Sequence, residues 1–483
     1  MRRSPLVFAL ALALSGVVHA AQPQPATAPQ ARPAAATATA SASITLTAPP
    51  TDWRTLAGQK VRIAAPLTLA GTDGLARFGE LSVAFDGRLW QPSEVAAPRT
   101  AGHAQITADN AHRRLVLDDG SDARDPGPVA YLPANAALRT GMLLRNVEGI
   151  VRIDAKGTPR LQVTAPLQVP AVERPAVPKV AGSLHIAAFN LENYFNGDGQ
   201  GGAYPTLRGA RTLAEHQAQT AKLVATINGL DAHIAALMEL ENDGYGPHSA
   251  IAELVDALNA PLDPKDAWAF VDAGQGPGSN PIRVGILYRK GWFKPLGRPL
   301  TRLDGPFAEH SRAPLAQAFQ GMGQPFMVVA NHFKSKGCRD ATGADADQND
   351  GQACWNATRV ESARQLNAWV QGEAARLKVK DVVLLGDFNA YAMEDPIRTL
   401  HDAGWRDAFA AAKVERPYSY VYNGLSGRLD HALLSPSMVQ RLQGAAEWHI
   451  NADEAEDVGY QGRNEPGPWR SSDHDPLLLG FDR

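Results

Sequence analysis

Polar side chains that can bind a metal ion or move a proton follow several apolar runs of this sequence. They are Asn190, Glu239, Asn331-His332, Asp387-Phe388-Asn389, Asp430-His431 and Asp473-His474. Any one of them could be the ordinary start of a loop, but their repetition with this choice of residues is unusual. Because the ends of neighbouring strands can meet at one rim of a sheet, we expect these side chains to lie close together.

Oxygen donors dominate this set, and histidines accompany them. Asn190, Glu239 and Asp473 are hard ligands that favour Mg²⁺, Mn²⁺ or Ca²⁺ over zinc, and the two cysteines form no thiolate cluster. A divalent ion neutralises a phosphate and stabilises the leaving oxygen, while a His–Asp pair handles the proton. The pattern therefore predicts metal-assisted hydrolysis of a phosphate ester.

The elements that must position these residues form an α/β region that begins near Leu184. Apolar runs alternate there with amphipathic stretches, without an internal repeat of fixed period. The runs predict strands over residues 184–189, 234–238, 284–288, 326–330 and 382–385, and helices over 214–227 and 357–377. Continuous apolar runs of this length are typical of strands that are buried on both faces.

Residues 44–170 have a shorter, β-like rhythm. Segments at 61–63, 81–85, 115–117 and 151–153 are separated by Gly, Asp, Asn and Pro clusters. They predict a small barrel or sandwich in which no helix exceeds a turn or two. An oligonucleotide-binding type of barrel would use Arg88 and Trp90 for charge and stacking, whereas a plain β-domain would only pack against its neighbour. A proline-rich linker at 171–182 separates the two parts.

The amino terminus has the features of an exported chain. Arg2 and Arg3 precede an apolar stretch and a small-residue cleavage site at Ala20, so residues 1–20 are predicted to be a signal peptide. Residues 21–43 consist mostly of Ala, Pro, Thr, Gln and Ser and predict a disordered linker. The apolar stretch is too short to span a bilayer, so we expect no stable membrane insertion. The predicted location is the periplasm, the cell surface or the medium.

Composition is that of a globular protein, with 44% hydrophobic and 20% charged residues, which excludes whole-chain disorder, collagen and coiled coil. The net charge of −3 does not indicate a nucleic-acid binder. That charge is unevenly divided. Residues 1–180 hold 19 Lys and Arg against 13 Asp and Glu, and residues 181–483 hold 28 against 37. The acidic part contains the candidate ligands, where a metal ion would supply the missing positive charge.

Six motifs occur in an order that has a counterpart in a known family. They are Asn190-Leu191-Glu192-Asn193, Leu237-Met238-Glu239, Asn331-His332, Gly386-Asp387-Phe388-Asn389, Leu429-Asp430-His431 and Ser472-Asp473-His474. This set resembles the endonuclease/exonuclease/phosphatase family. The runs 331–338 and 354–359 are similar to those of its secreted bacterial branch, the ExeM/NucH-type extracellular nucleases. The resemblance implies a four-layer α/β sandwich like deoxyribonuclease I over residues 183–483, preceded by the small β-rich domain, with an OB-like barrel as one form of it.

The resemblance also implies roles for the metal ligands and the nucleophile. Asn190, Glu239 and Asp473 would bind Mg²⁺ or Mn²⁺. Asp387 would orient or deprotonate the attacking water, and Asn389 would bind the scissile phosphate. Glu241 lies two residues from Glu239 and is a rival to it.

Two histidines complete the implied site. His474, oriented by Asp430, would be the acid–base or phosphate-stabilising group, and His332 would contact the phosphate from the other side. No motif identifies a partner for His332. Lys334 and Lys336 would hold neighbouring phosphates, and Arg359 and Arg428 have weaker support for the same task.

Cys338 and Cys354 lie sixteen residues apart in a chain that is predicted to be exported, so we expect a disulfide. The loop between them begins Asp345-x-Asp347-x-Asn349, like an EF-hand calcium loop. Its sixth position is Asp350 rather than Gly, and its twelfth is Asn356 rather than Glu. A structural Ca²⁺ is therefore one hypothesis and an ordinary solvated loop is the other.

Together these observations predict a secreted, divalent-metal-dependent nuclease whose partner is nucleic acid, DNA first and RNA second. A phosphodiesterase or phosphatase of the same fold, acting on phospholipids or small phosphate esters, would use the same core residues. A surface protein that binds DNA without cutting it is the third alternative. Endo or exo attack and oligomeric state are left open.

Overall fold

The computed structural model describes residues 43–483, except Asp122, Pro126, Asn135, Val172, Gln275 and Met322. The predicted signal peptide and all but the last residue of the predicted linker at 21–43 lie outside the described residues. Ser43–Arg483 clusters as a single unit. In this described part, no helix combines the length and the apolar character needed to cross a membrane.

Two six-stranded mixed sheets make up the α/β region. Sheet one has the order β11 (Trp268–Phe270), β12 (Ile282–Arg289), β10 (Ile234–Glu241), β9 (Leu184–Tyr194), β22 (Leu477–Phe481), β21 (Leu442–Glu447). Sheet two has the order β13 (Lys294–Thr301), β14 (Leu315–Gln320), β15 (Phe326–His332), β16 (Asp381–Asp387), β20 (Asp430–Leu434), β17 (Arg406–Asp407). A hairpin of β18 (Tyr420–Tyr422) and β19 (Leu425–Gly427) stands apart from both sheets.

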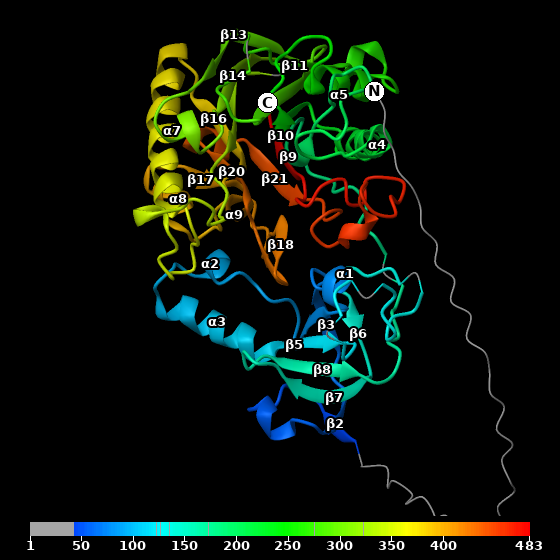
Figure 1. Ribbon diagram of the computed structural model, residues 1–483. Helices are drawn as coiled ribbons and strands as arrows, with labels where there is room; N and C mark the ends of the chain where they lie inside the picture. Colours follow the sequence, from blue (N-terminus) through cyan, green and yellow to red (C-terminus); the bar gives the residue numbers. More distant parts are fainter. Residues whose placement is uncertain are drawn as a thin grey trace, which may run out of the picture. The chain divides into compact units, whose positions relative to one another are not determined.

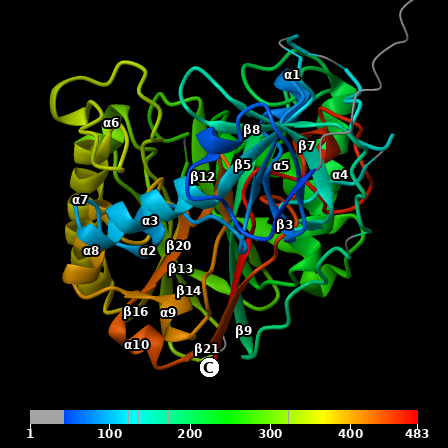
Figure 2. The same ribbon diagram turned by 90° about the horizontal axis from the view of Figure 1, so that it is seen from below.

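Helices cover the outer face of each sheet. These outer helices are α4 (Leu213–Gly229), α5 (Ala250–Asn259), α7 (Asn356–Leu377), α8 (Asp395–Asp402) and the short α6 (Pro306–Glu309). Two other short helices, α9 (Ala408–Ala411) and α10 (Pro436–Val439), pack against the core between the sheets. Figure 1 shows α7 on one side of the strands and α4 and α5 on the other. The view from below in Figure 2 has the same arrangement.

Alternation along the strands explains the four layers. On β9, Ile186 and Ala188 pack between the sheets with Val328 of β15, while Ala187 and Phe189 pack with Leu223 of α4. A strand points successive side chains to opposite faces, so apolar residues at every position bury both faces. The predicted four-layer α/β sandwich is confirmed, and the strands and helices that were predicted in it are all present.

Residues 44–163 form a separate β-rich sheet with its own hydrophobic core. Its strands are β1 (Ile44–Leu46), β2 (Lys60–Ile63), β3 (Leu67–Gly71), β4 (Leu81–Ala84), β5 (Arg114–Asp118), β6 (Leu143–Leu144), β7 (Val147–Ile153) and β8 (Pro159–Val163). The sheet order is β1-β2-β7-β8-β5-β4-β3-β6, and only three residues link β2 to β3. We call this region the barrel, after the sequence prediction. The β-rich character agrees with the sequence prediction, while the barrel form and the domain boundaries stay predictions.

Three helices accompany this barrel: α1 (Leu75–Phe78), α2 (Pro92–Val95) and α3 (Ala101–Arg113). The expectation that no helix here exceeds a turn or two is wrong, because α3 has 13 residues. Only Asn110 of α3 is buried, so the helix carries no apolar stripe from which it could have been recognised. Its start is marked by Thr100, whose side chain accepts a hydrogen bond from the His103 N–H.

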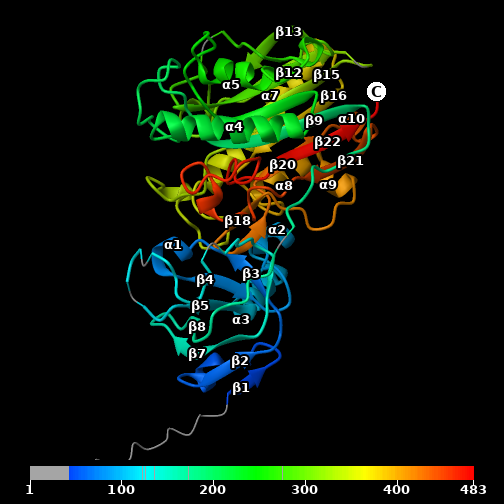
Figure 3. The same ribbon diagram turned by 90° about the vertical axis from the view of Figure 1, so that its right-hand side faces the viewer.

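Arg88 does not lie on a free nucleic-acid surface of the barrel. Its guanidinium lies 2.7 Å from Asp453 in the α/β region, and Trp90 forms a β-bridge with Ser426 of the β18–β19 hairpin. Figure 3 shows β18 between the barrel and the α/β sheets. The prediction that Arg88 and Trp90 bind an oligonucleotide is therefore replaced by the alternative, packing against the neighbouring region.

The proline-rich segment at 171–182 has no helix or strand among its described residues, yet it is attached to the α/β region. Arg174 pairs with Glu454 at 2.8 Å and with Glu465 at 2.7 Å. The Trp448 indole donates a hydrogen bond to the carbonyl of Pro175. These contacts hold the segment against the sheets.

Candidate active site

Sheet two places three predicted site residues in one row. His332 at the end of β15 pairs in register with Asp387 at the end of β16, and Asp387 pairs with Asp430 at the start of β20. Gly386 precedes Asp387 with φ 129, and a Cβ there would collide with the carbonyl oxygen of Asn331. The close approach of β15 and β16 at this end therefore requires a glycine.

Sheet one supplies Asn190 and Glu239 on the facing side. Asn190 on β9 pairs in register with Met238 on β10, and a bulge follows between Met238 and Leu240. The Asn190 amide donates a hydrogen bond to Asp387 Oδ2 at 3.2 Å, and Glu239 Oε1 lies 3.9 Å from His332 Nε2. The two sheets thus bring their polar strand ends together.

The β10 bulge decides between Glu239 and Glu241. Glu239 has φ 63, an uncommon conformation for this residue type, and its side chain faces His332. The Glu241 carboxylate instead accepts a hydrogen bond from the Asn196 N–H at 3.0 Å. The structure therefore favours Glu239, as the motif resemblance does.

Asp430 and His474 form the expected pair. His474 Nδ1 lies 2.7 Å from Asp430 Oδ2, and the Ser419 hydroxyl donates to the same oxygen at 2.7 Å. Tyr420 covers the imidazole, with ring centroids 4.6 Å apart. Asp473 lies beside the other edge of the ring, with Oδ1 4.0 Å from Nε2. The ring is therefore held from three directions.

We call the seven residues brought together here the rim: Asn190, Glu239, His332, Asp387, Asp430, Asp473 and His474.

The partner of His332, which no motif identified, is Asp387. His332 Nε2 lies 3.4 Å from Asp387 Oδ2. Burial and the charge of Arg312 lower the pKa of His332 well below 6.5. Burial would also lower the pKa of His474, but Asp430 and Asp473 raise it well above 6.5. Near neutral pH, His332 is accordingly neutral and His474 is a cation.

The carboxylates around the rim are short of positive charge. Burial raises the pKa of Asp387 to about 7. Burial and the charge of Asp473 raise the pKa of Glu192 to about 8, and the same two causes raise the pKa of Glu239. Strong pKa shifts that gather in one place are typical of functional sites.

The donor set fits a hard divalent ion. Glu239, Asp473 and Asn190 offer two carboxylates and one amide, and Mg²⁺ characteristically binds one or two carboxylates and retains several waters. Across the described residues, no group of three or more His, Cys, Asp or Glu side chains is arranged as a metal site. The fit therefore rests on the oxygen chemistry and the uncompensated charge of these residues.

Asn389 lies beside Asp387, where it can contact a phosphate. Its N–H donates to Asp387 Oδ1 at 2.8 Å, and its φ is 48. The side-chain amide donates to the Phe333 carbonyl at 3.2 Å. Glu192, Glu239 and Asn389 all have positive φ, a conformation that costs free energy and often gathers at functional sites.

Sequence reasoning missed three residues of this site. Glu192 was read only as part of a motif, yet it lies beside Asp473. Arg312 is buried, donates a hydrogen bond to the Phe333 carbonyl at 2.8 Å and interacts with Glu239 and Asp387. Arg208, an exposed loop residue, lies close enough for its charge to lower the pKa of His332. An arginine three residues before an apolar strand was the available signal for Arg312.

Three of the four basic residues suggested for phosphate binding have other partners. Lys336 donates to both oxygens of Glu394, at 2.7 and 2.6 Å, and to the Gln352 carbonyl at 3.0 Å. Arg359 donates to backbone carbonyls, and Arg428 pairs with Glu94 and Asp407. These partners favour a role in holding the fold over phosphate binding for all three residues. Lys334 alone keeps the assignment to phosphate, with its ammonium 4.8 Å from the centre of the Trp355 ring.

The disulfide between Cys338 and Cys354 is present. The acidic residues of the loop that it closes do not converge on a calcium position. Both oxygens of Asp345 accept hydrogen bonds from Thr358, and Asp350 accepts from Gln352 and pairs with Arg99 at 3.0 Å. The contacts favour the ordinary structural loop over the calcium hypothesis.

The two-sheet architecture and the rim define a class of phosphoester-hydrolysing proteins. A family model described as the Endonuclease/Exonuclease/phosphatase family matches residues 189–474, more than half of the chain. The chain therefore belongs to the endonuclease/exonuclease/phosphatase family, whose members are hydrolases. No curated protein matches the chain.

Three solved structures that are similar to the chain have low sequence identity to it. The endonuclease/exonuclease/phosphatase from Bacteroides vulgatus is 17% identical, with a TM-score of 0.39 over 61% of this chain and 97% of its own. A mannosyl-6-phosphatase from Bacteroides thetaiotaomicron is 15% identical, with a TM-score of 0.41 over 62% and 99%. TDP2 from D. rerio, complexed with single strand DNA product, is 16% identical, with a TM-score of 0.40 over 62% and 99%.

Proposed function

We propose that this protein is an exported, divalent-metal-dependent nuclease of the ExeM/NucH type that hydrolyses phosphodiester bonds in DNA, with RNA as a second substrate. One observation carries the proposal. His332, Asp387 and Asp430 stand in a row on adjacent strands, His474 is 2.7 Å from Asp430, and carboxylates without matching positive charge lie across from them.

The residues of the rim divide the chemistry among them. Glu239, Asp473 and Asn190 would hold Mg²⁺ or Mn²⁺, which neutralises charge on the phosphate. Asp387, ionised, orients the attacking water and accepts its proton. His332 Nε2 lies 3.4 Å from Asp387 Oδ2, and with its proton on this nitrogen His332 would help to keep that carboxylate in place. His474, a cation beside Asp430, donates from Nε2 to the phosphate or to the leaving oxygen.

Positive charge near His332 supports a polymeric substrate over a small ester. Arg208 and Arg312 lie close enough to lower the pKa of Lys334, after burial as the first cause. Three cations beside one end of the row can neutralise phosphates on either side of the cleaved bond. Export is supported by the predicted leader and by the Cys338–Cys354 disulfide, since such bonds persist in oxidising compartments.

The test is cleavage of plasmid DNA by the purified mature protein with Mg²⁺ and with a chelator. We expect cleavage only with the metal, and a loss of roughly 10²–10⁴-fold in His474→Ala. His112→Ala, an exposed histidine on α3, is the matched control and should cleave like the parent. Cleavage that is independent of metal, or equal in His474→Ala, contradicts the mechanism.

Two further substrates separate this proposal from its alternatives. The protein is incubated with a phosphomonoester and with a phospholipid under the same conditions. Release of phosphate or headgroup without DNA cleavage would replace the nuclease by a phosphatase or phospholipid phosphodiesterase. Retention of DNA without scission at any metal concentration would support a non-catalytic binding protein.

A further inference from the structure

A pocket of about 380 Å³ lies where the barrel meets the α/β region, directly beside the rim. Glu192 and Asp473 line the end of the pocket nearest the rim, and Tyr420, which covers His474, lines the same pocket. The opposite wall comes from the barrel, through Gly71, Thr72, Asp73 and Thr140. A volume above about 300 Å³ is enough for a small ligand group.

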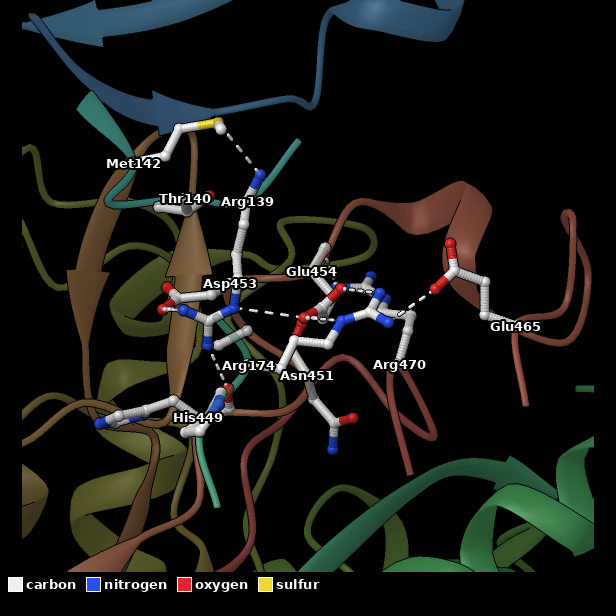
Figure 4. Close-up of polar contacts among 12 residues, drawn as sticks. Arg139, Thr140, Met142, Arg174, His449, Asn451, Asp453, Glu454, Glu465 and Arg470 are labelled. Carbon is white, nitrogen blue, oxygen red and sulfur yellow. Dashed lines mark hydrogen bonds and ion pairs between the residues drawn. The ribbon is translucent and has the colours of Figure 1, made fainter. Parts of the chain in front are cut away.

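Ion pairs hold the barrel in the position that forms this wall. Asp453 lies 2.7 Å from the Arg88 guanidinium and 3.3 Å from that of Arg139. Glu454 lies 3.2 Å from Arg139 and 2.8 Å from Arg174. Figure 4 shows Arg139 and Arg174 beside the neighbouring acids Asp453 and Glu454. We call Arg88, Arg139, Arg174, Asp453 and Glu454 the arginine interface.

Backbone contacts hold the hairpin that carries Tyr420 against the same barrel. The Ser426 N–H donates to the Leu89 carbonyl, and the Gln91 N–H donates to the Ser426 carbonyl, both at 2.9 Å. At Gly71 a Cβ would lie 3.1 Å from the Gly424 Cα, so barrel and hairpin touch without a side chain between them. The pocket is therefore formed before any ligand arrives.

The pocket offers aromatic rings and carboxylates together with one cation, Arg470, whose guanidinium donates to the Asn451 and Glu454 carbonyls. Tyr420, Tyr422 and Tyr460 line it, and Tyr422 is more than half exposed. Asp73 of the barrel and Glu456 of the α/β region both line the pocket, and burial together with the charge of Glu456 raises the pKa of Asp73. Glu454 is already paired with arginines. Aromatic faces stack on nucleobases, and carboxylates accept hydrogen bonds from base amino groups while repelling phosphates.

We propose that this pocket binds the base of the nucleotide next to the scissile phosphate, and that Asp73 selects bases that carry an amino group. The inference rests on the proposed nuclease function and adds a base subsite that the barrel and the α/β region build together. The phosphates stay on the side of Lys334 and Arg312, while the splayed base enters between the tyrosines and Asp73. The barrel is thereby part of the substrate site.

The experiment compares kcat/KM for single-stranded oligo(dC) and oligo(dT) of equal length, with bis(p-nitrophenyl) phosphate as a diester without a base. We expect the parent protein to prefer oligo(dC) by roughly fivefold or more, because one good contact to a base edge discriminates by that amount. Asp73→Ala should bring the ratio to about one without changing hydrolysis of the small diester. Tyr422→Ala should lower kcat/KM on both oligonucleotides by roughly tenfold through lost stacking, again sparing the small diester.

Asp86→Ala is the matched control, since Asp86 is an exposed barrel aspartate outside this pocket. It should retain the parent ratio. An equal rate on both oligonucleotides in the parent, a ratio that survives Asp73→Ala, or tighter binding of both oligonucleotides by Asp73→Ala overturns the base subsite. Hydrolysis of the small diester or of plasmid DNA with neither oligonucleotide cleaved also overturns it. If the parent hydrolyses none of these substrates with metal, the proposed nuclease function itself fails.

Discussion

The rim and the arginine interface both gather buried charged side chains, and they differ in how those charges are balanced. At the rim, burial and neighbouring acids raise the pKa values of Glu239 and Asp387. At the arginine interface, Asp453 and Glu454 are each within 3.3 Å of two arginines. Uncompensated charge destabilises a fold, so it marks residues whose task is outside folding, whereas compensated charge marks residues that hold the fold.

The largest effect is expected from removing one uncompensated charge. Glu239→Gln should lower kcat for DNA by roughly 10³-fold, about 4 kcal/mol of activation free energy, because a metal ligand is lost. The free energy of unfolding should stay the same or rise by about 1 kcal/mol, because burial and the charge of Asp473 disfavour the ionised Glu239 more than Arg312 and His474 favour it. Plasmid cleavage and urea unfolding measure the two quantities. A marked loss of stability would show that Glu239 is compensated in the fold.

The opposite result is expected at the arginine interface. Arg139→Met removes a partner from both Asp453 and Glu454 and should lower the free energy of unfolding by about 3 kcal/mol. Hydrolysis of bis(p-nitrophenyl) phosphate by the folded protein should stay close to the parent rate, because Arg139 is not a rim residue. Arg145→Met, at an exposed barrel position, is the control and should leave stability within about 0.5 kcal/mol. Loss of activity without loss of stability would erase the distinction between the two regions.

His431, a buried histidine beside the ion pair of Arg428 and Asp407, should make the free energy of unfolding depend on pH. Burial and the charge of Arg428 lower the pKa of His431 to about 4. The unfolded chain therefore takes up a proton near pH 6.5 while the folded one does not, so stability falls as the pH falls through this window. This group alone should lower the free energy of unfolding by about 2 kcal/mol between pH 7.5 and pH 5. In His431→Gln, the difference between the free energies of unfolding at pH 7.5 and pH 5, measured with urea, should be smaller by that amount. An unchanged difference would contradict a neutral His431 in the folded protein.

The α/β fold could be predicted from the sequence because strands that are buried on both faces appear as continuous apolar runs. Val328 and Val383 pack between the sheets while Val329 and Leu384 pack under α7, so the central positions of these strands are all apolar. The helix α3 was missed for the converse reason, since a polar helix on the surface of a barrel leaves no apolar stripe. Hydrophobic periodicity reflects burial, so an element with few buried side chains cannot be recognised from it.

The candidate site could be predicted only in part, because the type of a residue does not show which residue it forms a hydrogen bond or an ion pair with. Glu239 and Glu241 are identical in sequence terms, and the β10 bulge separates their tasks. Arg88 looked like a free cation of the barrel until its partner, 365 residues away, was known to be Asp453. Such pairings depend on the packing of the barrel against the α/β region, which no local pattern encodes.

The smallest effect concerns two lysines that the sequence treats alike. Lys334 belongs with the cations near the rim, whereas Lys336 forms an ion pair with Glu394. Lys334→Ala should raise KM for DNA only a few-fold and lower the slope of log KM against log salt by roughly 0.7–0.9, the share of one phosphate contact. Lys336→Met should leave that slope unchanged and destabilise the fold, because Glu394 is buried without its partner. Kinetics at several salt concentrations, with urea unfolding of both variants, distinguish the two. A slope change in Lys336→Met, or none in Lys334→Ala, would show that a compensated charge can still bind substrate and that the balance of charge is a poor guide to function here.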